Sequence, residues 1–563
     1  MNIFRCFRSL PILLLSASVL LSIVSCNFLK KDLARPKLVV GIVVDQMRWD
    51  YLYRYYSRYG DDGFRRLLSK GYECRQTSIN YLPSYTAPGH ACIYTGSVPA
   101  IHGIAGNDWY DATTGVYHYC VDDTSVTTTG DRNDGYSMSP ANLLTTTITD
   151  ELRLASNFRS RVYGIALKDR GSILPAGHLA NAAYWYNDKT GNFISSTYYN
   201  NPNPKWLQSF NKRRVGDSLV QQGWDLLYKP ETYLNSTADS SIYEGPFKWE
   251  TSPVFPRRFD TLTSKTRNTV LKSIPAGNTF TIMMAKACIE GEQLGKGENT
   301  DFLALSLSST DYIGHRFAPN SVEIEDTYLR LDKDIANLLQ YLDRKYGKNN
   351  YLVFLTADHG GAHNPQFLTD NHVPAGASPT DVTTEINSYL SSIFGLDSIV
   401  TFTENYQICL NESLFTRYTL SRSDVRSTII KWLYAQPEVA FVIDLENQQL
   451  TNVPEPIRTM VTNGYHSSRS GGIQIILKPA WFYNQGHNTG TTHGTWNPYD
   501  AHIPLLWFGW RIPHGSTSTP VYMTDIAPTL ADMLHIQMPN GCIGKPIVPL
   551  LDAPPKNRRR NRQ

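Results

Sequence analysis

Short apolar runs of strand length, separated by helical patterns, constrain the fold of this chain more than any other feature. The run from Leu38 to Val44 is the first, and similar runs occupy residues 161–167, 301–307, 351–355 and 503–508. Runs that are apolar throughout predict strands buried on both faces of a parallel sheet. Their alternation with helical patterns predicts an α/β fold, a doubly wound and mostly parallel sheet sandwiched by helices.

Two stretches interrupt this pattern. Residues 179–299 are rich in Asn, Pro and Tyr and show weak periodicity, so we expect a cap inserted into the sheet domain rather than strands of the sheet. Residues 366–470 form a second insertion with a mixed pattern of their own. We expect Ile473 to Leu477 to resume the sheet, so that the catalytic core comprises residues 37–178, 300–365 and 471–550. A chain of 563 residues is long enough for such a core.

The N-terminus has the pattern of an export signal. Arg5 and Arg8 precede an apolar region, Leu10 to Val24, that is too short for a spanning helix. The small residue before Cys26 resembles a bacterial lipobox and predicts a lipid anchor at Cys26, with an ordinary signal peptide as the alternative. We therefore expect an exported protein, in the periplasm and anchored to a membrane, with a signal peptide, a tether and a basic disordered tail at residues 1–25, 26–36 and 551–563.

Charge and cysteine content narrow the function classes. The formal net charge of +3 includes the basic residues of the signal and of the tail, and the body without them is net acidic. A nucleic-acid partner is therefore not predicted. No CxxC pair is present, which argues against a zinc site built from cysteines. Six cysteines lie in the body, an even number compatible with disulfides outside the cytoplasm: Cys74, Cys92, Cys120, Cys288, Cys409 and Cys542.

Carboxylate and imidazole groups follow the predicted strands. Because the carboxyl ends of parallel strands meet at one edge of a sheet, we expect these groups to converge. Oxygen and imidazole ligands without thiolate suit zinc, with manganese or another divalent metal as the alternative. Two ions about 4 Å apart clamp the attacking and leaving oxygens of a phosphoryl group. Taken singly, each residue could instead cap a helix or face solvent; the set is Asp45, Asp311, His315, Asp358, His359 and His493.

A hydroxyl nucleophile is predicted at Thr86. It lies just before Pro88, which suits the first turn of a helix. A helix that begins here directs backbone N–H groups and the positive end of its dipole toward the Thr86 hydroxyl, which favours binding of a tetrahedral anion. Threonine is a weak nucleophile that needs a base or a metal, and the neighbouring ligand set would supply the metal.

Three further polar residues are candidates for binding the anion. Lys168 and Arg170 stand at the end of the strand predicted over residues 161–167, and Asn107 lies in a Gly-Asn-Asp-Trp stretch. Arg suits a bidentate grip on phosphate and Lys supplies a point charge. A solvated strand end is the alternative for the two cations, and a turn-forming role is the alternative for Asn107.

These motifs together resemble a known family. Thr86-Ala87-Pro88-Gly89-His90, Ser309-Thr310-Asp311 with His315, Thr356-Ala357-Asp358-His359-Gly360 and His493-Gly494 look like the alkaline phosphatase superfamily. Asn107-Asp108-Trp109 and Lys168-Asp169-Arg170 are similar to the phosphate-irrepressible alkaline phosphatases, which are periplasmic phosphomonoesterases with a threonine nucleophile. The resemblance spans residues 37–550, nearly the whole mature chain.

The resemblance implies two Zn²⁺ ions and a role for each residue. One zinc is held by Asp311, His315 and His493, and the other by Asp45, Asp358, His359 and the Thr86 oxygen. Thr86 would attack phosphorus and form a phosphothreonine, while Asn107, Lys168 and Arg170 bind the equatorial oxygens. The lysine takes the region in which other members keep a third metal, so magnesium is not expected. His90, His102, His487 and His502 are expected to be supporting groups rather than ligands.

Two alternatives remain open at this point. A phosphodiesterase or nucleotide pyrophosphatase of the same superfamily also uses threonine, but it lacks an equivalent Lys-x-Arg because a diester carries less negative charge. A non-catalytic lipoprotein that binds phosphate or glycan through an aromatic-rich cap is the other. The complete ligand set favours hydrolysis of small-molecule phosphate monoesters over both.

Overall fold

A computed structural model provides the structure of the protein. It describes residues 33–111, 114–130, 137–379, 381–483 and 488–551. The expected signal peptide, Cys26, most of the tether, His487 and nearly all of the basic tail lie outside the described residues. Within the described part of the chain, no helix combines the length and the apolar character needed to cross a membrane.

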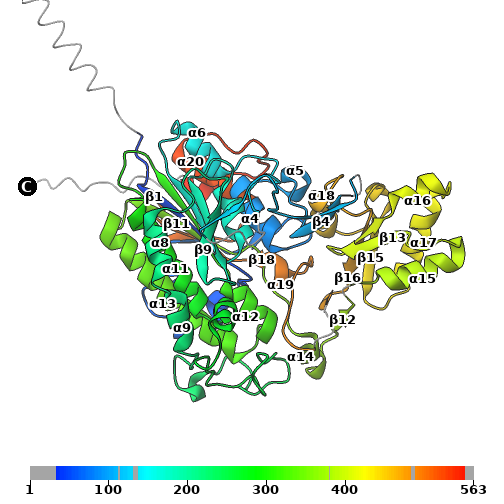
Figure 1. Ribbon diagram of the computed structural model, residues 1–563, viewed down its shortest axis with the longest axis horizontal. Coiled ribbons are helices and arrows are strands. Elements are labelled where there is room, and N and C mark those ends of the chain that lie inside the picture. Colours follow the sequence, from blue (N-terminus) through cyan, green and yellow to red (C-terminus); the bar gives the residue numbers. More distant parts are fainter. Residues whose placement is uncertain (1–32, 112–113, 131–136, 380, 484–487, 552–563) are drawn as a thin grey trace, which may run out of the picture.

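The core is a ten-stranded sheet whose central strands are parallel (Figure 1). Strand β1 (Leu38–Val44) lies between β10 (Asp301–Leu307) and β11 (Tyr351–Thr356), and β7 (Val162–Ile165) follows beside β10, all parallel. On the other side β19 (Leu505–Gly509) pairs antiparallel with β11 and continues to β2 (Tyr72–Cys74) and β20 (Gly515–Thr517). The predicted α/β fold with a mostly parallel central sheet is confirmed.

Apolar sequence explains the position of β1 at the centre. All seven of its side-chain positions are buried, as expected for a strand covered on both faces. Gly41 in its middle has no side chain, and a Cβ there would lie 2.4 Å from the Phe354 ring and 2.5 Å from the Tyr94 hydroxyl. Glycine thus lets one ring from the neighbouring strand and one from a covering helix close over β1.

Helices cover the sheet in two layers (Figure 1). One layer contains α4 (Thr86–Thr95), α6 (Ile148–Ala155), α7 (Asp169–Ala176) and α20 (Ile526–Leu534). The other contains α3 (Phe64–Lys70), α11 (Ala276–Gly291) and the 25-residue α13 (Val322–Tyr346). Ser321 caps α13 by accepting from the backbone N–H of Ile324, and the helix is followed by Gly347 at φ +81°.

The expectation that residues 179–299 form a cap inserted into the sheet domain was wrong for their two ends. Strands β8 (Ala182–Asn187) and β9 (Asn192–Ser196) extend the main sheet beyond β7 toward β6 (Thr128–Thr129), and α11 packs on β10. Tyrosine and asparagine in β8 hide the strand pattern, although all six positions are buried. Only the middle, with α8 (Lys205–Lys212), α9 (Val215–Gln221) and α10 (Ser264–Val270), belongs neither to the sheet nor to the two helical layers that cover it.

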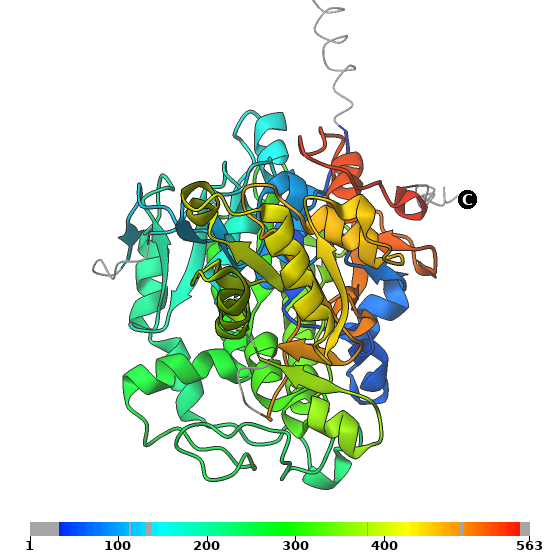
Figure 2. The ribbon, with the colours of Figure 1, turned by 90° about the vertical axis from the view of Figure 1, so that its right-hand side faces the viewer.

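The second insertion forms a compact unit with its own hydrophobic core. Its four-stranded sheet has the order β13 (Val400–Glu404), β14 (Gln407–Leu410), β16 (Ile473–Leu477), β15 (Val439–Asp444). Helices α15 (Thr383–Phe394) and α17 (Arg422–Tyr434) cover this sheet, and Figure 2 shows them nearest to the viewer. The expectation that β16 resumes the main sheet was therefore wrong, because a five-residue apolar run does not specify which sheet it joins.

The six described cysteines are all free thiols, so the even count does not correspond to disulfides in this structure.

Candidate active site

The candidate residues gather at the carboxyl edge of the central strands. Asp45 directly follows β1, Lys168 lies just beyond β7, and Asp358 lies two residues beyond β11. Helix α12 (Ser309–Phe317) begins immediately after β10 and carries Asp311. This is the edge at which open α/β sheets bind their ligands. His493 lies in the irregular segment 488–497, before α19 (Pro498–Ala501), and belongs to no strand end.

One potential metal-binding group consists of Asp311, His315 and His493, whose ligand atoms all lie within 4.8 Å of one another. Asp311 and His315 are one turn apart on α12, and His315 Nε2 lies 3.1 Å from Asp311 Oδ1. His493 Nε2 lies 3.6 Å from the same oxygen. Burial alone would raise the pKa of Asp311, but the neighbouring His315 and Lys168 outweigh it and hold that pKa well below its usual value.

The second group consists of Asp45, Asp358 and His359, also within 4.8 Å of one another and all completely buried. His359 Nε2 lies 3.5 Å from Asp45 Oδ1 and 3.5 Å from Asp358 Oδ2. No donor forms a hydrogen bond with either of these two carboxylate oxygens; the His90 Nδ1 that lies 3.3 Å from Asp358 Oδ2 bonds the Thr86 carbonyl instead. Burial of unpaired carboxylate oxygens is costly unless a cation joins them, so this donor set fits a metal ion. The rings of His359 and His493 stack with their centroids 3.5 Å apart, so the two groups are neighbours.

Backbone carbonyls orient all three imidazoles. The Nδ1 atoms of His315, His359 and His493 lie 2.8, 2.9 and 2.8 Å from the carbonyl oxygens of Thr491, Gly360 and Ser84. A carbonyl only accepts, so each Nδ1 carries the proton and each Nε2 presents its lone pair to the centre. This is the arrangement by which metal-binding histidines are held.

Lys168 connects the two groups. Its Nζ lies 2.7 Å from Asp45 Oδ2 and 2.6 Å from Asp311 Oδ2, and 3.3 Å from the Thr86 hydroxyl. The side chain is 4% exposed. Burial lowers the pKa of Lys168, but the two carboxylates outweigh burial and raise it, so the amine stays protonated. A fixed positive charge thus lies beside the predicted nucleophile.

Thr86 is the first residue of α4 and is buried. Its Oγ1 lies 3.4 Å from His359 Nε2, next to the second group. The helix begins at the threonine itself, so Pro88 lies in its first turn, as predicted. Gly89 allows the helix to approach the Asp358 backbone, since a Cβ there would lie 2.6 Å from the Asp358 carbonyl oxygen.

Asn107 lies at the start of α4, and Arg170 lies in the first turn of α7. Asn107 Oδ1 accepts from the backbone N–H of Ala87 at 2.9 Å, so its amide is held at the start of α4. Arg170 Nη1 donates to the Tyr119 hydroxyl at 3.0 Å, and that hydroxyl donates to Asp169. Arg170 Nε is buried without a hydrogen-bond partner, an unsatisfied donor that suits an anion.

The sequence did not predict a role for Gln46, which contacts both groups of metal-ligand candidates, whereas it did predict His90 as a supporting residue. Gln46, at φ +61°, donates from Nε2 to Asp311 Oδ1 at 2.8 Å and from its backbone to Asp358 Oδ1 at 3.2 Å, and so contacts both groups. Its position directly after Asp45 is the only signal in the sequence. His90 lies 3.3 Å from Asp358 Oδ2 and 2.8 Å from Ser306 Oγ, as a supporting group would.

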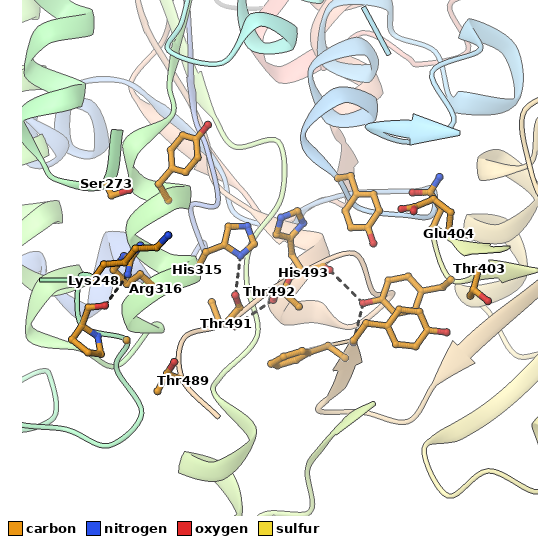
Figure 3. A pocket seen from close by; sticks show the side chains of 18 residues that line it. Lys248, Ser273, His315, Arg316, Thr403, Glu404, Thr489, Thr491, Thr492 and His493 are labelled. Carbon is orange, nitrogen blue, oxygen red and sulfur yellow. Dashed lines mark hydrogen bonds between the residues drawn. The ribbon is translucent and has the colours of Figure 1, made fainter. Parts of the chain in front are cut away.

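A cleft of about 830 Å³ opens beside His315 and His493 (Figure 3). The second insertion forms one wall, with Tyr406 stacked on Tyr483 at 4.2 Å between ring centroids. Gly245, Pro246, Lys248 and Arg316 form the opposite wall, where Figure 3 labels Lys248 and Arg316. The candidate metal groups therefore lie at a buried edge that communicates with solvent through this cleft.

Comparison with known proteins identifies the class. The sequence profile of the type I phosphodiesterase / nucleotide pyrophosphatase family matches residues 39–500. The fold superposes on the crystal structure of wild-type alkaline phosphatase PafA with a TM-score of 0.90, at 47% identity, covering 92% of this chain and 99% of that one. Fold and site together define a metal-dependent hydrolase of the alkaline phosphatase superfamily.

Three named relatives show to which type within the superfamily the chain belongs. The chain is 49% identical over 521 residues to alkaline phosphatase PhoV of Synechococcus elongatus, covering 92% of this chain and 94% of PhoV. It is 47% identical over 518 residues to PafA of Elizabethkingia meningoseptica, covering 92% and 95%. A Myroides odoratus protein named calcium-transporting ATPase is 52% identical over 520 residues, covering 92% and 95%. The chain belongs to the alkaline phosphatase superfamily and, within it, to the PhoV and PafA type.

Proposed function

We propose that this protein hydrolyses small-molecule phosphate monoesters through a phosphothreonine at Thr86, with two zinc ions at the centre. The observation that carries the proposal is the position of the Thr86 hydroxyl, 3.4 Å from His359 Nε2 and 3.3 Å from Lys168 Nζ. Membership in a family of alkaline phosphatases supports it, and neither a non-catalytic binding protein nor a diesterase is favoured.

Each ligand group suits one zinc ion. Asp311, His315 and His493 would hold one ion, while Asp45, Asp358 and His359 would hold the other together with the Thr86 oxygen. Mixed carboxylate and imidazole ligands are those that zinc prefers in catalytic sites. When bound, zinc supplies Lewis acidity that lowers the pKa of a hydroxyl and stabilises negative charge on phosphoryl oxygens.

The residues of the chain perform the remaining tasks. The Thr86 oxygen attacks phosphorus in line as the bond to the leaving oxygen breaks, and water then attacks the phosphothreonine to release phosphate. The protonated amine of Lys168 and the guanidinium of Arg170 neutralise phosphoryl oxygens, and Asn107 offers an amide donor. The first turn of α4 adds backbone N–H groups and the positive end of its dipole.

The two cations favour a monoester over a diester. A monoester dianion has three unesterified oxygens, whereas a diester has two and one negative charge fewer. Lys168 and Arg170 therefore gain more from the monoester. The test is kcat/KM for phenyl phosphate and for methyl phenyl phosphate on the purified protein supplied with zinc. We expect the monoester to react faster, and a faster diester would contradict the proposal.

Substitution of Thr86 tests the nucleophile. Thr86→Ala removes the hydroxyl without removing any of the six side-chain metal ligands, so phosphate release should fall to background while zinc content stays the same. Thr86→Ser keeps a hydroxyl and should retain measurable turnover. Near-wild-type turnover in Thr86→Ala would eliminate the assignment of Thr86 as the nucleophile.

ATP should be included among the substrates tested, because the Myroides odoratus relative is named a calcium-transporting ATPase.

We also propose that the protein is exported and anchored by a lipid on Cys26, for which the basic and apolar N-terminal sequence and the small residue before Cys26 are the support. Cys26→Ser should move phosphatase activity from the membrane fraction to the soluble fraction in a bacterial host. Activity that stays with membranes in this variant would argue against the anchor.

A further inference from the structure

One wall of the cleft carries positive charge that the proposed reaction does not use. Lys248 and Arg316 line the cleft together with the metal-ligand candidates His315 and His493. In Figure 3 both cations lie on the same side of His315, opposite Thr403 and Glu404. Neither cation forms a salt bridge with a carboxylate in the part of the chain that the structure describes.

Contacts between Arg316 and residues 245–247 hold the wall that carries Lys248 and Arg316 in place. Arg316 Nη1 donates to the carbonyl of Pro246 at 3.0 Å, and the Gly245 N–H donates to the carbonyl of Arg316 at 2.9 Å. The Arg316 guanidinium lies 4.6 Å from the ring centre of Phe247, which is 3% exposed. These contacts fix the loop that carries Lys248 against α12. Lys248 itself is exposed and lines the cleft, so its amine is available to a ligand.

Arg316 has an unused donor. Its Nε is buried and has no hydrogen-bond partner, so the described protein leaves the bonding capacity of this guanidinium incomplete. The opposite wall carries Glu404 instead, which repels a second negative group. An anionic leaving group bound in the cleft is therefore drawn to one side only.

We propose that Lys248 and Arg316 form a subsite for a second anionic group on the leaving part of the substrate. The substrate class is then phosphate monoesters whose alcohol also carries a carboxylate or another phosphate. The inference rests on the proposed function, because the cleft receives a leaving group only if a phosphoryl group reacts at the adjacent centre. The subsite adds affinity and selectivity and takes no part in bond breaking.

The test uses two aryl phosphates of similar shape and leaving-group acidity, 3-carboxyphenyl phosphate and 3-methylphenyl phosphate. The observable is the ratio of their kcat/KM values, charged over neutral. Lys248→Ala should lower this ratio about threefold, as expected for an exposed ion pair. Lys248→Glu should lower it further and Lys248→Arg should preserve it. Because Lys248 is exposed, the wild-type ratio should fall with added salt.

Lys229→Ala is the matched control, since Lys229 is exposed but does not line the cleft. A ratio that is the same in wild type, Lys248→Ala and Lys248→Glu would overturn the subsite. A further comparison shows which second anionic group the subsite prefers. It sets kcat/KM for two substrates that carry a carboxylate, 3-carboxyphenyl phosphate and 3-phosphoglycerate, against kcat/KM for a sugar bisphosphate. If neither aryl phosphate is hydrolysed, the proposed function fails as well, which is a different result from hydrolysis with an unchanged ratio.

Discussion

Asn405 donates a hydrogen bond from its side-chain amide to the backbone carbonyl of Asp108, at 2.7 Å. Asn405 lies at the turn between β13 and β14 of the second insertion, and Asp108 follows directly after the predicted phosphate ligand Asn107. The next residue of the turn, Tyr406, lies with its hydroxyl 3.5 Å from the carbonyl of His493. The tip of this hairpin therefore contacts two segments that carry predicted functional residues.

Removing the Asn405 amide should loosen the Asn107 loop. Asn405 adopts φ +56°, which glycine also tolerates, so Asn405→Gly deletes the hydrogen bond without forcing the backbone. Because Asn107 must be held to bind phosphate, loss of this partly buried hydrogen bond, worth about 1 kcal/mol, should lower kcat/KM on a monoester roughly fivefold. Asn411→Ala, whose amide bonds Ser398 within the insertion, should leave kcat/KM unchanged.

A second variant tests the same contact from the other side. A Cβ on Gly106 would lie 2.4 Å from Asn405 Nδ2, so Gly106→Ala should separate the hairpin from the loop and lower kcat/KM as well. Full activity in both Gly106→Ala and Asn405→Gly would show that the hairpin does not position Asn107.

Lys168 should decide the preference for monoesters. Lys168→Met removes a buried cation that lies 3.3 Å from Thr86. We expect the rate on phenyl phosphate to fall on the order of 100-fold, as for loss of one charge-stabilising donor, and the rate on methyl phenyl phosphate to fall less. The measurement is kcat/KM on both substrates, with Lys286→Met, which contacts Asn337, as control. Equal losses on the two substrates would contradict this role.

Chelation should remove stability together with activity. Without metal, Asp45 and Asp358 are fully buried carboxylates with only partial neutralisation. Ligand present at 1,000 times its dissociation constant adds about 4 kcal/mol to the free energy of unfolding. We therefore expect EDTA to lower Tm by several degrees and zinc to restore both Tm and turnover.

The zinc content of single variants should identify the two groups. His315→Ala and His359→Ala each remove a ligand from a different group, so each should reduce the bound zinc from two ions per chain to one. His514→Ala, on the exposed surface, should keep both ions. Two ions retained in either ligand variant would refute the assignment, whatever the effect on turnover.

Asp500 should make stability depend on pH. Burial raises the pKa of this fully buried carboxyl to about 7 from its ordinary value of 3.8, even though Thr495 donates to it twice. A raised pKa in the folded state means that the stabilisation from the protonated form is lost as pH rises through that value. Between pH 6 and 8 this group alone should lower the free energy of unfolding by about 1.4 kcal/mol.

Urea unfolding of the metal-free protein at pH 6 and pH 8 measures that loss. Asp500→Asn stays neutral at both values, so its free energy of unfolding should change less between them than that of the wild type. Asp532→Asn, on the exposed surface, should change as the wild type does. An identical pH dependence in wild type and Asp500→Asn would exclude Asp500 as its source.

The sequence by itself determined the parts of this protein that are encoded locally. A seven-residue apolar run rich in β-branched residues favours a buried strand over a helix, so β1 and the carboxylate after it were predictable. The spacing of Asp311 and His315 places both on one helix face, and the fit of several short motifs to one superfamily indicated a joint role for residues hundreds of positions apart.

Tertiary structure decided what local pattern leaves open. The sheet to which β16 belongs, and the inclusion of β8 in the main sheet, depend on which strand edges meet during folding. The contacts of Gln46, Asn405 and Tyr406 with the site depend on turns whose direction no periodicity records. Hydrogen bonds and charge pairs act over a few ångströms in space, whereas sequence patterns report only neighbours along the chain.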